Sequence, residues 1–133
     1  MNNIKIVYII LLCISLGFLP GISYAQKTSK AVPLCEKAGK AMQSQDFVKA
    51  MDYLNQAQLK DPNYPDIYIM KGDVFNFNLM SDSAMLNYQR AIDLIGEPDP
   101  MLYYIAGNEG AKCGAYEYAL KTLQLFMQKG IQY

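Results

Sequence analysis

From residue 32 onwards, apolar and polar positions follow the spacing of amphipathic helices, and short turn-forming stretches interrupt them at regular intervals. Apolar residues recur three and four positions apart, which places them on one face of a helix. No segment has the sustained alternation of apolar and polar residues that is typical of a half-buried strand. The pattern predicts no sheet and six helices, at residues 32–44, 47–60, 65–78, 81–95, 100–113 and 116–129.

Capping and turn residues predict where several of these helices begin and end. Asp46, Ser81 and Asp99 have side-chain oxygens that can accept hydrogen bonds from the free backbone amides of a first helical turn. Residues 61–63, Asp-Pro-Asn, end one helix, because proline disfavours a helical conformation in the residue before it. Pro65 opens the next helix, at a position where its missing N–H leaves no backbone hydrogen bond unmade.

The helices also repeat as pairs. A shift of 34 residues aligns Ala50 with Ala84, and a further shift of 35 residues aligns Ala84 with Ala119. Small residues align with small and large with large along the period, including Ala57 with Ala91, Leu54 with Tyr88 and Leu123, and Gly72 with Gly107. Such self-similarity is typical of a repeat protein in which each unit is one helix pair. The units cover about residues 31–64, 65–99 and 100–133.

Small residues on the facing surfaces of a pair let its two helices approach closely. Gly72 and Gly107 occupy such places on first helices, with Ala38 in the corresponding place of the first unit. The large residues expected to fill the gaps around them are Tyr68, Phe75, Tyr88, Tyr103 and Tyr116. Tyrosine suits these places because its ring can pack while its hydroxyl reaches water or a turn.

The residue types at these spacings are those of a known family. The second unit has Tyr68, Gly72 and Phe75 on its first helix and Ala84, Tyr88 and Ala91 on its second. With the matching residues of the other two units, this pattern resembles the tetratricopeptide repeat family over residues 26–133. The resemblance implies an all-α fold, in which three stacked antiparallel helix pairs form a short right-handed α-solenoid. It also implies a non-enzymatic scaffold for protein–protein interaction.

The third unit departs from the family pattern at two positions. Gly110 stands where a large residue is usual, and Phe126 stands where a small one is usual. The two changes are either a compensating size swap that keeps the helix pair packed or the mark of an irregular last unit. Terminal units of repeat proteins are often atypical, because they lack a neighbour on one side.

Residues 1–25 have the features of a secretory signal peptide. One positive charge, at Lys5, precedes an apolar run, and small residues lead to an expected cleavage site after Ala25. The alternative is a membrane anchor, but the apolar run of about 14 residues is shorter than the ~20 that cross a bilayer. We therefore expect a repeat domain at residues 26–133 with no stable membrane span. Together with the family resemblance, this implies export to the periplasm or cell envelope of a Gram-negative bacterium.

The chain offers no recognisable catalytic or metal-binding constellation. It has no histidine, which is the commonest general base and metal ligand. Cys35 and Cys113 lie in different units, so we expect neither a zinc site nor a disulfide but two free thiols on or near helix surfaces. The 12 basic and 12 acidic residues are interspersed, which argues against a nucleic-acid partner. We expect no enzymatic activity and no cofactor.

The family resemblance implies that a partner protein binds on the concave face, which the first helices of the units line. By helical phase, the candidate partner-binding residues are Gln43, Asp73, Asn76, Phe77, Tyr104, Asn108 and Lys112. Alternatively, they are ordinary solvated side chains, since exposed polar residues need no further explanation. A second candidate is an interaction patch on the last helix, formed by Leu125, Phe126 and Met127. A second copy of the chain in a homodimer, another protein, or sequence beyond residue 133 would cover this patch.

Two function classes follow from these expectations. The first is a complete interaction scaffold of the cell envelope that binds a protein partner. The second is the N-terminal module, or a fragment, of a larger outer-membrane or peptidoglycan-associated assembly protein or of a secretion-system protein. The second class rests on analogy of fold alone.

Overall fold

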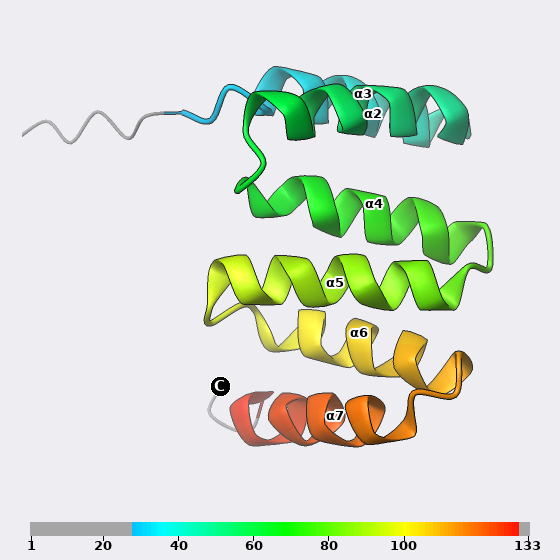
Figure 1. Ribbon diagram of the computed structural model, residues 1–133, viewed down its shortest axis with the longest axis vertical. Coiled ribbons are helices and arrows are strands. Elements are labelled where there is room, and N and C mark those ends of the chain that lie inside the picture. The colour runs from blue at the N-terminus through cyan, green and yellow to red at the C-terminus, as the bar shows by residue number, and fades with distance from the viewer. Residues whose placement is uncertain (1–27, 131–133) are drawn as a thin grey trace, which may run out of the picture.

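Six α-helices and their short connections make up residues 28–130, the part of the chain that the computed structural model describes (Figure 1). The helices are α2 (Val32–Gln43), α3 (Phe47–Lys60), α4 (Pro65–Phe77), α5 (Ser81–Ile95), α6 (Pro100–Lys112) and α7 (Tyr116–Gly130). Every predicted helix is confirmed, and every boundary lies within one residue of its predicted position. The predicted signal peptide and its cleavage site after Ala25 lie outside the described residues.

The helices pack as three antiparallel pairs, α2 with α3, α4 with α5 and α6 with α7, and the pairs stack in chain order (Figure 1). Contacts of α3 with α4 and of α5 with α6 join neighbouring pairs, and α2 also reaches α4. The chain therefore forms the short all-helical solenoid that the sequence predicts. No helix between residues 28 and 130 is both long enough and apolar enough to cross a membrane.

Glycines on the first helices admit large side chains from the second helices. A Cβ added at Gly72 would overlap the ring of Tyr88, and one added at Gly107 would lie 2.9 Å from Leu123 Cγ. The two glycines are equivalent in the repeat, and so are Tyr88 and Leu123. The first unit has Ala38 in the glycine position, and Ala38 is fully buried. The predicted match of small and large residues is therefore confirmed within the pairs.

The third unit does contain a size swap, but Phe126 is not the residue that compensates. A Cβ added at Gly110 would lie 2.7 Å from Tyr118 Cδ1, so the ring of Tyr118 fills the space beside this glycine. The equivalent residues of the second unit are Phe75 and Ser83, a large and a small residue in the opposite order. The α6–α7 pair stays packed because the large residue has moved from the first helix to the second.

The turn inside each pair has the same backbone conformation in all three units. Gln45, Leu79 and Gly114 are equivalent in the repeat and have positive φ angles of 60°, 59° and 84°. A backbone hydrogen bond closes each turn. The amide of Asp46 donates to the Ala41 carbonyl at 2.9 Å, that of Met80 to the Phe75 carbonyl at 2.9 Å, and that of Ala115 to the Gly110 carbonyl at 2.8 Å. This left-handed conformation suits glycine and is strained for other residues. The geometry therefore repeats more faithfully than the residues that adopt it.

Two of the three predicted caps are confirmed and one is wrong. Asp46 Oδ1 accepts from the Lys49 amide at 3.1 Å, and Asp99 Oδ1 accepts from the Met101 amide at 2.8 Å. Ser81 is instead the first residue of α5, and Met80 is the N-cap with no side-chain hydrogen bond. The turn with left-handed Leu79 ends one residue earlier than a serine cap would require.

Candidate partner-binding surface

The seven predicted partner-binding residues lie on the first helices of the three pairs. Gln43 ends α2, while the others are Asp73, Asn76 and Phe77 on α4 and Tyr104, Asn108 and Lys112 on α6. Five of them are exposed, whereas Asp73 and Asn76 are half-buried. The structure therefore leaves most of this surface open to solvent.

The half-buried part of the surface is a polar contact between α4 and α5. The Tyr88 hydroxyl donates to Asp73 Oδ1 at 2.7 Å, and the side chain of Asn76 lies near the same hydroxyl. Burial raises the pKa of the Asp73 carboxyl, and the hydrogen bond from Tyr88 opposes this rise. Burial and the neighbouring Asp73 both raise the pKa of the Tyr88 hydroxyl. Asp73 thus holds the second pair together and is not a free side chain.

Two aromatic rings on this surface are packed on one side and open on the other. Phe77 is 61% exposed, and its ring centroid lies 4.2 Å from that of Phe47 on α3. Tyr104 is 44% exposed, and its centroid lies 5.3 Å from that of Phe126 on α7. Each ring is held by a neighbour, so a partner that covered its open side would bury apolar area with little loss of side-chain freedom.

Lys112 is held in place by a residue that the sequence analysis missed. Its ammonium lies 2.6 Å from Glu109 Oε1, and the Glu109 side chain is only 1% exposed. Glu109 Oε2 has no hydrogen-bond partner within residues 28–130. The equivalent residue of the second unit is Val74, which is buried. The sequence does contain a signal for this ion pair, because a glutamate stands at an apolar position of the repeat, three residues before a lysine.

The predicted patch on the last helix is divided between the core and the surface. Leu125 and Phe126 are half-buried against the core, whereas Met127 is 61% exposed. The exposed apolar stripe of α7 consists instead of Met127 with Leu120, 62% exposed, and Tyr116, 72% exposed. Tyr116 therefore does not fill a gap between helices, which contradicts the expectation for this residue.

This stripe, Tyr116, Leu120 and Met127, occupies positions that face the following pair in the other units. The equivalents of Leu120 and Met127 in the second unit are Met85, whose sulfur lies 3.9 Å from Cys113 of the third unit, and Ile92, which is buried. In the first unit, Phe47 is the equivalent of Tyr116, and it contacts Phe77 of the second. The stripe thus continues the stacking surface on the last helix that the structure describes. This helix, α7, lies at the end of the stack (Figure 1).

The two cysteines within residues 28–130 differ in exposure. Cys35 is buried and Cys113 is exposed, and both are free thiols. Burial, with a smaller effect of the Asp66 charge, raises the pKa of the Cys35 thiol to about 11. The expectation of a thiol near the surface is therefore confirmed for Cys113 and wrong for Cys35, whose side chain belongs to the core.

This difference predicts unequal reactivity. In the chain that begins at residue 26, we expect Cys113 to react with an aromatic disulfide reagent at pH 8, and Cys35 to react roughly a hundredfold more slowly until the protein unfolds. Counting the released thiolate over time checks this. The variant Cys113→Ser should lose the fast phase, and two fast thiols in the parent would contradict the burial of Cys35.

No protein-family model and no curated protein sequence matches this chain. Between residues 28 and 130, no group of three or more histidine, cysteine or acidic side chains is placed to hold a metal ion. The equivalent turns and the paired small and large residues of the chain itself support the repeat.

Proposed function

We propose that this chain is a scaffold of the tetratricopeptide repeat type that binds a segment of another protein and has no catalytic activity. The family assignment is supported by the helix pairs, by the glycines that admit Tyr88 and Leu123, and by the recurring left-handed turn. The binding segment would lie across α4 and α6, on the open side of Phe77 and Tyr104.

The observation that carries this proposal is the pair of exposed, supported aromatic rings beside exposed polar groups. Aromatic residues are enriched among the side chains that contribute most to binding in protein interfaces. Asn108, which is exposed on α6, has an amide that can donate to and accept from a partner backbone. Lys112 adds a positive charge held in position by Glu109. The surface therefore combines apolar anchors with groups that can set orientation.

Removal of the two rings tests the proposal. The double variant Phe77→Ala and Tyr104→Ala should lose at least about tenfold in affinity for a partner captured from the envelope fraction, because truncating two anchors removes more than 1 kcal/mol. A matched control is Leu59→Ala with Leu86→Ala, since these residues are 86% and 63% exposed on the second helices α3 and α5. Equal losses in both double variants would contradict a site on the first helices.

We also propose that the chain is exported to the cell envelope and cleaved after Ala25. The support is the sequence of residues 1–25, in which a charged start, a short apolar run and a small-residue end follow the order of a signal peptide. Protein purified from the envelope fraction should begin at Gln26. An N-terminus at Met1 in the membrane fraction would contradict this assignment.

A second candidate function is a module that stacks on a further helical unit. That unit would belong to a larger outer-membrane, peptidoglycan-associated or secretion-system assembly, or to a second copy of the chain. The observation that favours it is the α7 stripe, Tyr116, Leu120 and Met127, since the equivalent positions elsewhere contact the next pair. Unpartnered apolar surface of this kind marks interaction sites more often than ordinary surface.

The α7 stripe predicts self-association of residues 26–133. Leu120→Lys with Met127→Lys should weaken association at least about tenfold without unfolding the chain, because a partner helix would bury unpaired charges and both residues are exposed here. Sedimentation equilibrium of the parent and the variant measures the difference. A parent that remains a monomer at millimolar concentration would contradict self-association through α7.

A further inference from the structure

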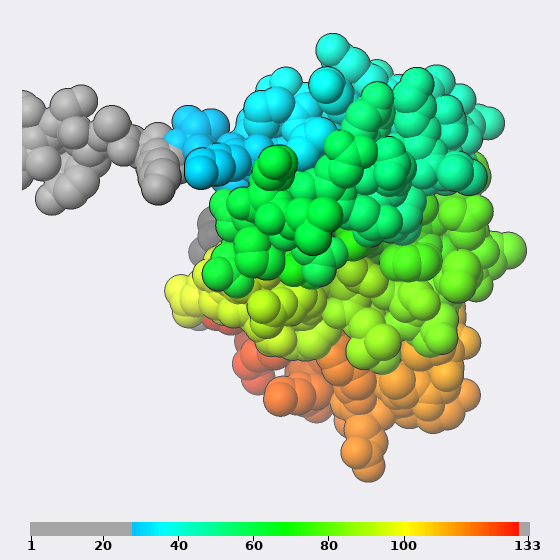
Figure 2. All heavy atoms as spheres, turned by 45° about the horizontal axis from the view of Figure 1, so that its top comes forward, coloured from blue at the N-terminus to red at the C-terminus, as the bar shows by residue number. Residues whose placement is uncertain are grey.

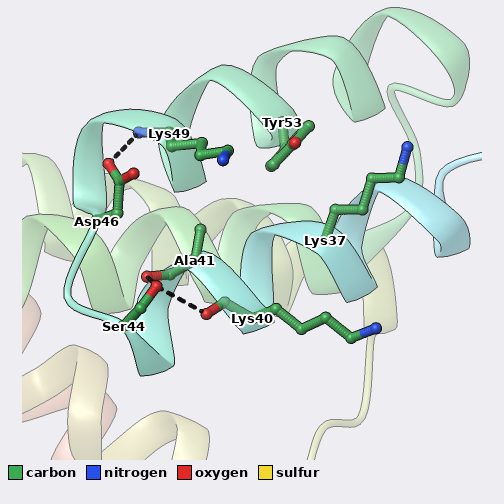
Figure 3. A pocket seen from close by; sticks show the side chains of 7 residues that line it. All are labelled: Lys37, Lys40, Ala41, Ser44, Asp46, Lys49 and Tyr53. Carbon is green, nitrogen blue, oxygen red and sulfur yellow. Dashed lines mark hydrogen bonds between the residues drawn. The ribbon is translucent and has the colours of Figure 1, made fainter.

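The α2–α3 pair forms the end of the stack opposite α7 (Figure 2). A pocket of about 230 Å³ lies between residues of these two helices (Figure 3). Lys37 and Lys40 line this pocket from α2, and Lys49 and Tyr53 line it from α3 (Figure 3). We name this group of Lys37, Lys40, Lys49 and Tyr53 the lysine pocket. Two helices thus place three lysines around one pocket.

The lysine pocket has an unbalanced positive charge. Within residues 28–130, none of its three ammonium groups has a carboxylate oxygen within 4.0 Å, since the ion pairs there involve other lysines. Asp46 is the single acidic residue that lines the pocket, and its Oδ1 accepts from the Lys49 amide as the cap of α3. Three positive charges and one negative charge leave 3 − 1 = +2. The whole chain has a formal net charge of +0, whereas the residues that line this pocket sum to +2.

The aromatic ring of Tyr53 gives the pocket an apolar side. The Lys37 ammonium lies over this ring, 5.9 Å from its centroid, which is within the range of a cation–π contact. Tyr53 is half-buried. The pocket therefore combines positive charges with a flat apolar ring. This combination suits a peptide with aspartate or glutamate side chains, in which a short aliphatic stem carries each carboxylate.

Two of the three lysine positions are not lysine in the other units, whereas Lys37 corresponds to Lys71 and Ala106. Lys40 corresponds to Val74 and Glu109, and Lys49 corresponds to Ser83 and Tyr118. Val74 and Glu109 are buried inside the stack, so Lys40 replaces residues that are covered in the other units. Solvation of an end face requires polar residues of either sign. Lysines of like charge around one pocket repel one another, and an acidic ligand would relieve this repulsion.

We propose that the lysine pocket binds an acidic segment of a protein partner, with carboxylates bridging the lysines of α2 and α3. Successive carboxylates along an extended segment can reach ammonium groups on both helices, whereas a single small anion can meet only part of the set. The pocket is at the end of the stack, and neither Phe77 nor Tyr104 lines it. The scaffold could therefore hold an acidic segment while another segment occupies α4 and α6.

The test uses a fluorescein-labelled peptide of six glutamates and residues 26–133 of the chain, with fluorescence anisotropy as the readout. We expect saturable binding that weakens as salt rises from 50 to about 300 mM, because exposed charges are screened over this range. Lys37→Gln, Lys40→Gln and Lys49→Gln together should weaken binding about tenfold or more. A labelled peptide of six glutamines should not bind.

A control triple variant separates the pocket from the overall charge. Lys30→Gln, Lys60→Gln and Lys121→Gln remove the same charge from exposed positions outside the pocket, and binding should then fall less than about threefold. Equal losses in the two triple variants would overturn the proposal, and so would the absence of peptide binding by the parent. Displacement of the peptide by inorganic phosphate at similar concentration would show a simple anion site and would also overturn it.

Discussion

Gly72→Ala is expected to destabilise the protein by about 1–3 kcal/mol, the usual cost of overpacking a filled core. The new methyl group would overlap three atoms of the Tyr88 ring, which is fully buried. Tyr88 cannot simply rotate away, because its hydroxyl is hydrogen-bonded to Asp73. Ordinary helix propensity would predict the opposite sign, since alanine is favoured over glycine in a helix by about 1 kcal/mol. The sign of the measured change therefore reports on the packing.

Gly39→Ala is the matched control for this substitution. Gly39 also lies inside a first helix, but an added Cβ would meet only Met70 Cε at 3.7 Å, an ordinary contact. We expect Gly39→Ala to stabilise the protein by about 0.5–1 kcal/mol through helix propensity. Urea unfolding followed by circular dichroism measures both changes. Two stabilising substitutions would mean that Tyr88 does not pack against Gly72.

Leu79→Gly is expected to stabilise the protein by about 1 kcal/mol, because leucine at a positive φ is strained and glycine is not. The leucine side chain is 89% exposed, so its removal loses little packing. Gly114 has the same conformation in the third unit, and no atom lies within 4 Å of a Cβ added there. Gly114→Ala should therefore destabilise by about 1 kcal/mol through the backbone alone. Opposite signs at these two equivalent positions are the expected result in thermal unfolding, and equal signs would contradict the shared turn geometry.

The helices could be predicted closely because their signals are local. Apolar spacing, proline at first positions and the caps at Asp46 and Asp99 act within a few residues. The predicted cap at Ser81 is wrong because of the backbone conformation of the preceding turn, which the residue types do not indicate. A left-handed Leu79 is rare enough that the sequence gives no sign of it, and the turn it forms places Met80 at the cap.

The candidate surfaces were less predictable because they depend on how helices turn toward one another. A rotation of one residue, about 100° around a helix, exchanges a buried position for an exposed one. The sequence analysis therefore included Leu125 and Phe126 in a surface patch, whereas Leu120 is the more exposed residue. The lysine pocket needs the packing of α2 against α3, and the neutral composition of the whole chain concealed it.

The most direct test of the central claim, a partner held on the first helices, is site-specific photocrosslinking in the envelope. A photoreactive residue would replace Asn108 on α6 in one variant and Leu86 on α5 in another, since both positions are exposed. The account predicts a discrete crosslinked product from position 108, its loss when Phe77→Ala and Tyr104→Ala are added, and no such product from position 86. A product from position 86 with none from position 108 would contradict the account.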